Sequence, residues 1–280
     1  MTSLLDAIAA GITVYDLGRP LQTGIPCSPN HPGFRMTLLR RHGDMVRADG
    51  SSAANELIIT GGHVGTHMDA LAHVSYQGAL HGGVPVDEAM ENGRFTTHGA
   101  DELPATLIRG VLLDVARVHG VEHLPAGYGI GPHDLDRAAE QAGVEIRPGD
   151  VVLVRSGWGR LWSDTAAYVG HDTGVPGPTE AAADWLADRR VRATGSDTIA
   201  YEQISAEAGH ALLPVHRRLI VEAGVPIIEV LDLEGVGAAG VHEFCLVLAP
   251  LNVVGGTGAP IRPLAVVDAP SPDVDDVHGD

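Results

Sequence analysis

The eleven residues from His63 to His73, with the sequence HVGTHMDALAH, constrain this chain more than any other feature. They place three histidines and one aspartate close together in a stretch that contains a glycine. Histidine nitrogens and carboxylate oxygens are together the ligands that zinc or manganese favours in proteins. A single histidine would more often be an ordinary surface or core residue. The combined pattern His-x3-His-x-Asp with a further histidine instead indicates a metal site.

The spacing of these four residues predicts an extended strand. His63, His67, Asp69 and His73 all stand at odd positions, so a strand would turn them toward one cleft. A helix would keep His63 and His67 together but would turn Asp69 away. Gly65 also disfavours a helix, and it would let the backbone pass close to an ion or substrate.

The four residues are expected to have two different roles. A catalytic metal needs an open position for water or substrate, and four successive ligands would leave few. We therefore assign His63, His67 and Asp69 as metal ligands. His73 is assigned as the general base and acid, with a near-neutral pKa suited to proton transfer. A ligand role for His73 is the alternative.

Apolar runs and helical spacings predict a mixed architecture. Helices are expected at His133–Ala142, at Thr179–Arg189 with Thr179 as N-cap, and at Leu212–Ala223 with Gly224 as its stop. Strands are expected at residues 12–17, 56–60, 110–115, 150–155, 225–231 and 244–250. Because strands and helices mix without strict alternation, we expect an α/β or mixed α+β fold in a single domain over residues 1–267.

Both ends of the chain have their own predictions. The N-terminal MTSLLDAIAAGI lacks a basic region and a long apolar run, so we expect a short docking helix and no signal peptide. Residues 268–280 are rich in proline and aspartate and are predicted to be a disordered acidic tail.

Charge and cysteine content exclude several kinds of partner. The chain has 18 basic and 36 acidic residues, a formal charge of −18, so nucleic acid and anionic membranes are not expected partners. The sequence contains no run of eighteen apolar residues, so no membrane span is expected. Cys27 and Cys245 are far apart and form no CxxC pattern, which fits a cytoplasmic protein.

The central motif resembles HxGTHxDxPxH, the signature of the cyclase family of metal-dependent hydrolases, which includes bacterial kynurenine formamidase and isatin hydrolase. Weaker similarities occur in the family's order along most of the chain, at residues 14–26, 151–158, 195–198, 216–236 and 256–267. The resemblance implies a single-domain swivelling β/β/α-type fold with a mixed sheet or barrel-like core and flanking helices. It also implies a homodimer or homotetramer.

Two further residues enter through the resemblance. His216 and Glu229 match the distal pair that completes a second metal site in two-metal members, with Asp69 and Glu229 bridging the ions. His210 is a competing candidate for His216. A glutamate inside the apolar run VPIIEVLDL would be costly to bury without a partner, which favours the role of Glu229 at a metal.

The chain departs from the family pattern at two positions. Leu71 stands where the common motif has proline, and Val230 stands where many members have asparagine after the glutamate. The ligand positions themselves are retained. We therefore expect that the chain belongs to a different branch of the family. The substrate of the kynurenine formamidase branch is not assigned to it.

These observations predict a metal-dependent hydrolase, with one or two Zn²⁺ or Mn²⁺ ions, that cleaves an amide-type C–N bond in a small molecule. The resemblance suggests aryl formamides or cyclic amides as substrates, so the C–N bond that is cleaved is not a peptide bond. A metal-dependent cyclase or lyase that acts on a polyketide-like or amino-acid-derived metabolite is the first alternative. A non-catalytic small-molecule binding protein is the second, but it would have no need of His73.

Overall fold

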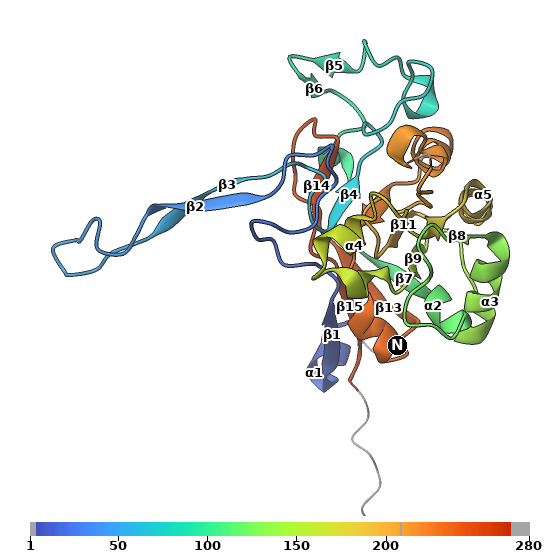
Figure 1. The fold of residues 1–280 in the computed structure, drawn as a ribbon. Coiled ribbons are helices and arrows are strands. Elements are labelled where there is room, and N and C mark those ends of the chain that lie inside the picture. Colours follow the sequence, from blue (N-terminus) through green and yellow to red (C-terminus); the bar gives the residue numbers. More distant parts are fainter. Residues whose placement is uncertain (1–3, 208, 270–280) are drawn as a thin grey trace, which may run out of the picture.

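The computed structural model describes residues 4–207 and 209–269. Within these residues, nine strands form one mixed sheet in the order β1–β15–β13–β7–β9–β11–β12–β4–β14 (Figure 1). The strands are β1 (Ile12–Asp16), β4 (His67–Asp69), β7 (Thr106–Asp114), β9 (Val151–Arg155), β11 (Ala193–Ser196), β12 (Ile227–Glu229), β13 (Glu243–Leu248), β14 (Gly258–Pro260) and β15 (Leu264–Asp268).

The middle of the sheet is parallel and its flanks are antiparallel. Strands β7, β9, β11 and β12 run in the same direction. On one flank β13, β15 and β1 are antiparallel to their neighbours, and on the other flank so are β4 and β14. The predicted mixed sheet with flanking helices is therefore confirmed.

The helices are short, and α2, α3 and α5 lie on one side of the sheet (Figure 1). They are α1 (Leu4–Ala10), α2 (Val115–Val118), α3 (Pro132–Ala142), α4 (Thr165–Val169), α5 (Glu180–Asp188), α6 (Pro214–His216), which continues as the π-helix η5 (Arg217–Ala223), and α7 (Glu234–Ala238). Short 3₁₀ turns are η1 (His81–Gly83), η2 (Ala100–Glu102), η3 (Trp158–Leu161) and η4 (Gly209–Ala211).

Burial of both faces of β9 organises the core. Val152 and Val154 pack with Leu135 of α3 and Leu186 of α5 in one apolar cluster. Leu153, which points to the opposite face, joins a second cluster formed with β13 and α7. All five residues of β9 are buried, as a central strand of a sheet covered on both sides requires.

The predicted elements agree well with the observed ones. The six predicted strands overlap β1, β3, β7, β9, β12 and β13, and the three longer helices overlap α3, α5 and α6–η5. The Thr179 hydroxyl accepts a hydrogen bond from the Ala182 amide at 3.3 Å, as expected of an N-cap. Gly224 ends the third helix with φ = 67°, a left-handed conformation that glycine adopts without strain.

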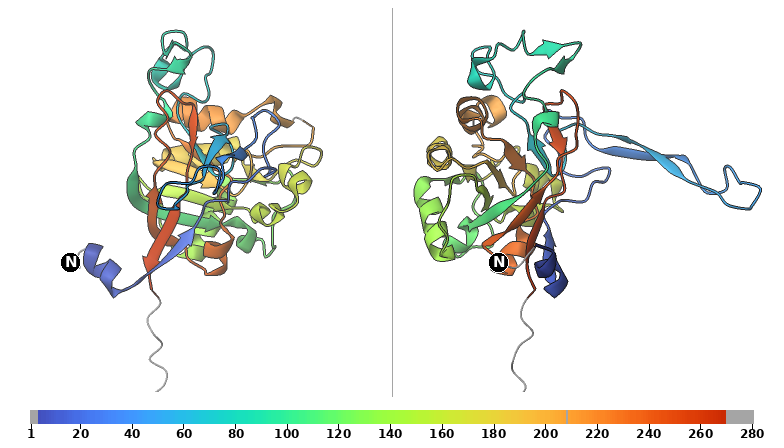
Figure 2. Two further views of the ribbon diagram at one scale, coloured as in Figure 1. Left: turned by 90° about the vertical axis from the view of Figure 1, so that its left-hand side faces the viewer. Right: turned by 180° about the vertical axis from the view of Figure 1, so that it is seen from behind.

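Three small pairs of strands lie outside the nine-stranded sheet. Strands β8 (Gly129–Ile130) and β10 (Gly177–Pro178) pair in parallel, and β5 (Met90–Glu91) pairs with β6 (Arg94–Phe95). Strands β2 (Arg35–Arg40) and β3 (Asn55–Ile59) form a long antiparallel hairpin. This hairpin, hereafter the arm, projects away from the rest of the protein in Figure 1 and in the right-hand view of Figure 2.

The predictions for the chain ends have separate outcomes. The N-terminal segment does form a helix, α1, and its Leu4 and Leu5 are exposed. Asp268 ends strand β15, and residues 270–280 of the predicted tail lie outside the described residues. No helix in the described part of the chain has the length and apolar character needed to cross a membrane.

Candidate metal centre

The motif is only partly a strand. Residues His67–Asp69 form β4, whereas the segments before and after it are turns. Gly65 has φ = +65°, and the His73 amide donates a hydrogen bond to the Ala70 carbonyl at 2.9 Å. The predicted extended strand over 63–73 is therefore wrong outside β4, because the paired parts of β12 and β14 are each only three residues long.

Strand pairing brings the distant residues to the motif. Strand β4 lies between β12 and β14, and His67 stands directly opposite Glu229. Directly opposed residues of an antiparallel pair have neighbouring side chains. His216 arrives from α6, the helical segment that precedes β12 along the chain.

Asp69 lies at the centre of the resulting cluster. Its Oδ1 is 2.7 Å from His63 Nδ1 and 3.4 Å from His67 Nε2, and its Oδ2 is 3.6 Å from His216 Nε2. His216 Nε2 also lies 3.2 Å from Glu229 Oε1. The structure thus brings these residues together from three separate parts of the chain.

His73 completes the group of six predicted residues. Its ring stacks on the ring of His63 with 4.0 Å between centroids, and it lies 6.1 Å from the ring of His216. The competing His210 belongs to η4, but its side chain lies outside the described residues.

The donor atoms fit a divalent ion. Two sets bring their nitrogen and oxygen atoms within 4.8 Å of one another, and they are His63–Asp69–His73 and His67–Asp69–Glu229. Both sets include Asp69, whose Oδ2 is buried and has no hydrogen-bond partner among the described residues. A buried carboxylate oxygen without a partner is unfavourable unless a ligand or ion occupies its lone pairs.

His67 is oriented by the backbone of the motif itself. Its Nδ1 donates a hydrogen bond to the Gly65 carbonyl at 2.8 Å, so Nε2 is left to face Asp69 and Glu229. Fixing one ring nitrogen in this way selects the tautomer that presents the other nitrogen to a metal. A side chain at Gly65 would collide with Leu21, because a Cβ would lie 2.5 Å from Leu21 Cδ2.

The charges of the metal-free cluster are complementary. Burial opposes ionisation of Asp69, but the surrounding histidines outweigh it and hold the pKa of its carboxyl well below the usual range. Burial likewise opposes the charge on His63, but the adjacent Asp69 carboxylate raises the pKa of this histidine above its usual value. Asp69 therefore remains anionic, as a metal ligand must be.

His73 differs from His63 and His216 in the direction of its pKa shift. Burial, reinforced by the neighbouring histidines, lowers the pKa of His73 to about 3 although Asp69 opposes the shift. The near-neutral pKa expected from the sequence is therefore wrong for the metal-free protein. The imidazole is neutral at pH 7, which is the form that accepts a proton.

Glu202 belongs to the cluster and was missed by the sequence analysis. It is 1% exposed, and its Oε1 lies 2.6 Å from His216 Nδ1 and accepts a hydrogen bond from the His216 amide at 3.0 Å. Burial opposes the charge on His216, but its carboxylate partners outweigh burial and raise its pKa well above the usual value. A carboxylate behind a ligating histidine is a common feature of metal sites. The signal was present, since Glu202 stands in the largely apolar run IAYEQI.

We expect Glu202→Gln to lower the affinity of the protein for Zn²⁺ or Mn²⁺ by about 10- to 100-fold, as removal of such supporting carboxylates does. The neutral amide keeps the size of the side chain but removes the charge behind His216. Titration with a metal indicator measures the change. Glu222→Gln, on the partly exposed surface of η5, is the matched control and should retain the affinity of the unsubstituted chain. Equal affinities in the two variants would contradict this positioning role.

Val230, directly after Glu229, explains why β12 ends earlier than predicted. Its φ is 58°, and its amide donates to the Thr198 carbonyl at 3.0 Å. A β-branched residue is strained in this left-handed conformation, whereas asparagine adopts it more readily. The asparagine found here in many members of the resembled family therefore suits the backbone better than valine does.

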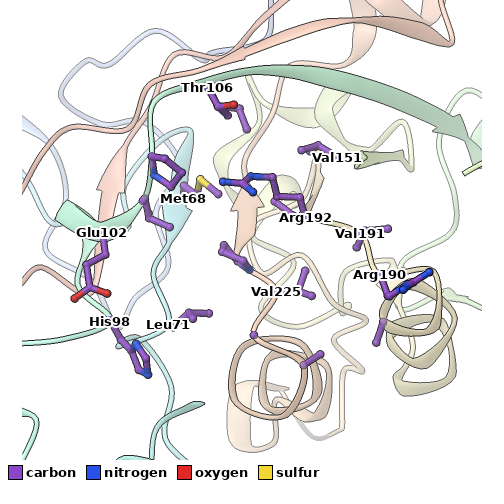
Figure 3. A pocket seen from close by; sticks show the side chains of 18 of the residues that line it. Met68, Leu71, His98, Glu102, Thr106, Val151, Arg190, Val191, Arg192 and Val225 are labelled. Carbon is purple, nitrogen blue, oxygen red and sulfur yellow. The ribbon is translucent and has the colours of Figure 1, made fainter. Parts of the chain in front are cut away.

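A separate cavity of about 460 Å³ lies behind β4 (Figure 3). Met68, which points away from the side of β4 that carries His67 and Asp69, lines it together with Leu71 and Arg192. None of the six predicted site residues lines this cavity. It is therefore distinct from the candidate metal centre.

The fold and the site define a class of protein: a curled mixed sheet with flanking helices that carries a buried His/Asp/Glu cluster. The chain belongs to the putative cyclase family, which it matches over residues 15–203. This confirms the family predicted from the central motif.

Individual relatives agree with this assignment. The chain is 33% identical to an isatin hydrolase from Roseibium aggregatum over 137 residues, which is 48% of this chain and only 51% of that relative. A crystal structure of a novel cyclase is similar with a TM-score of 0.82 and 27% identity, covering 94% of this chain and 93% of that one. A predicted metal-dependent hydrolase from Bacillus stearothermophilus has a TM-score of 0.59 and 26% identity, covering 91% of this chain and 98% of that one.

Proposed function

We propose that this chain is a metal-dependent hydrolase that opens an amide-type C–N bond in a small molecule. The observation that carries the proposal is the buried Asp69, whose Oδ2 has no hydrogen-bond partner among the described residues and which belongs to both sets of donor atoms. The isatin hydrolase and metal-dependent hydrolase relatives support the reaction class.

We assign His63, His67 and Asp69 to one metal site, and His216 and Glu229 to a second, with Asp69 and Glu229 shared. The ions are Zn²⁺ or Mn²⁺, because imidazole and carboxylate donors suit both metals. A bound ion supplies two effects, a lower pKa of water and a polarised substrate carbonyl. Burial of the cluster keeps the donor atoms away from bulk solvent and strengthens their electrostatic effect.

In this proposal the neutral His73 removes a proton from the attacking water and returns it to the leaving nitrogen. Its place beside His63 puts it at the edge of the cluster, where it can serve both steps. A single histidine can act first as base and then as acid because each step reverses its protonation state.

The substrate class we propose is an aryl formamide or a cyclic aryl amide. Assays of purified protein, reconstituted with Zn²⁺ or Mn²⁺, should show opening of isatin or hydrolysis of an N-formyl arylamine by absorbance. The chelated protein is the control and should be inactive. Opening of no amide or lactam in a broad panel, together with elimination or cyclisation of another substrate, would replace hydrolysis with the cyclase or lyase alternative.

Several wider features belong to the same proposal. Residues 1–267 would form one catalytic domain, and the protein would act in the cytoplasm, in keeping with its free Cys27 and Cys245. We also propose that the protein is a homodimer or homotetramer. Neither nucleic acid nor a membrane is proposed as a partner, because the chain carries a formal charge of −18.

A further inference from the structure

Thr66 lies inside the motif, directly before the predicted ligand His67, and it belongs to neither set of donor atoms. The residue is nevertheless buried, with 2% of its surface exposed. Its hydroxyl donates a hydrogen bond to the Val230 carbonyl at 2.7 Å and accepts one from the Arg19 amide at 2.8 Å. One side chain therefore joins three segments that are far apart in the sequence.

The hydrogen bond from Thr66 is one of two that hold Val230. The other runs from the Val230 amide to the Thr198 carbonyl at 3.0 Å. The amide and the carbonyl of Val230 belong to the two peptide planes whose rotation about its Cα atom defines φ and ψ. The two bonds together therefore hold the φ of 58°, which is a strained value for a β-branched residue.

Arg19 anchors the other side of the Thr66 hydroxyl. Its guanidinium pairs with Asp232 Oδ2 at 2.8 Å, and only 8% of its side chain is exposed. Asp232 follows Val230 by two residues, and its amide donates a hydrogen bond to the Leu17 carbonyl at 2.9 Å. The segment that carries Arg19 is thus fastened both to Thr66 and to the chain that leaves β12.

We propose that Thr66 is a positioning residue, which aims Glu229 at the metal by holding Val230 in its left-handed conformation. Glu229 is the last residue of β12, and its Oε2 lies 3.6 Å from His67 Nε2. Backbone strain persists only where the surrounding structure holds it, so without the hydroxyl Val230 relaxes and the backbone beside Glu229 turns. The inference rests on the proposed role of Glu229 as a metal ligand and adds how the chain orients that ligand.

The test compares the Zn²⁺ affinity of the full chain with that of Thr66→Val, which keeps the approximate size of the side chain and removes the hydroxyl. The affinity should fall by about 10-fold or more, as it does when other groups that orient ligands are removed. Thr66→Ser keeps the hydroxyl and should retain the affinity of the unsubstituted chain. Equal affinities of Thr66→Val and the unsubstituted chain would overturn the proposal.

Thr179 provides the matched control. Its hydroxyl makes the same pair of bonds, since it donates to the Ile130 carbonyl at 3.2 Å and accepts from the Ala182 amide at 3.3 Å. These bonds lie at the start of α5 and not at the candidate metal centre. Thr179→Val should therefore leave the Zn²⁺ affinity unchanged. A loss as large as that in Thr66→Val would mean that any missing hydroxyl has this effect, and it would contradict a specific role for Thr66.

A second substitution tests the route through Val230. Asparagine adopts the left-handed conformation more readily than a β-branched residue does, so Val230→Asn needs less support from Thr66. In the Val230→Asn background, Thr66→Val should therefore cost less Zn²⁺ affinity than it does beside valine. Equal losses in the two backgrounds would show that Thr66 does not act through Val230.

Hydrogen exchange of the Val230 amide tests the same contact without any metal. In the metal-free protein, Thr66→Val should speed this exchange by about 10-fold or more, because Val230 is then held on one side only. Unchanged exchange would refute the role of Thr66, whereas an unsubstituted chain that binds neither Zn²⁺ nor Mn²⁺ would refute the proposed metal centre. Should Thr66→Val fail to fold, as judged by circular dichroism, recovery of the fold on adding Val230→Asn supports the proposal, and no recovery refutes it.

Discussion

Replacing Asp69 with asparagine is expected to remove most of the bound divalent metal and to lower kcat/KM by roughly 1000-fold or more, since a metal supplies several kcal/mol of transition-state stabilisation. Asp69 is the residue shared by both donor sets, so its loss weakens the two sites together. Asparagine preserves the size of the side chain but removes the negative charge at the centre of the cluster.

Metal content per chain and steady-state kinetics on the same preparations measure this prediction. Asp184→Asn is the matched control, because Asp184 is half-exposed on α5 and pairs with a surface arginine, Arg218. The control should keep the metal and the activity of the unsubstituted chain. A stoichiometric metal content in Asp69→Asn would show that the ion is held by other residues and would overturn the proposed centre.

The sequence analysis predicted which residues form the cluster better than it predicted their backbone conformation. Period-two alternation correctly places His67 and Asp69 on one face, because these residues form a real strand. His63 and His73 come to the same place through turns, which a residue count cannot distinguish from a longer strand. Gly65 is the residue in the motif that argues against a continuous strand, because a glycine in the left-handed conformation ends a strand instead of extending it.

Long-range features were predictable only where a family pattern existed. Glu229 reaches the motif because β12 pairs with β4, and sheet order cannot be derived from local propensity. Glu202 had no such pattern, although the burial argument used for Glu229 applies equally to it. Only the second strand of the arm was predicted, at residues 56–60, and its first strand, β2, was missed. Exposure of the arm on both faces follows from its projection and not from its composition.

Replacing His73 with alanine is expected to abolish most turnover while the metal remains bound. General acid–base catalysis contributes about 100- to 10,000-fold to a rate, so kcat should fall within that range. Metal content must be measured together with kcat because the geometry also allows His73 to bind the metal. His73 belongs to a possible donor set with His63 and Asp69, and its neutral ring could bind a metal as well as a proton.

Metal analysis beside kinetics separates the two roles of His73. A low kcat with full metal content means that its ring transfers protons, and a control substitution of the exposed His171 should change neither quantity. Loss of metal together with activity would make His73 a ligand, so that the base would have to be found elsewhere. Unchanged kcat would remove His73 from the reaction altogether. We expect retention of the metal and loss of the proton transfer, because four successive ligands would leave the metal few open positions.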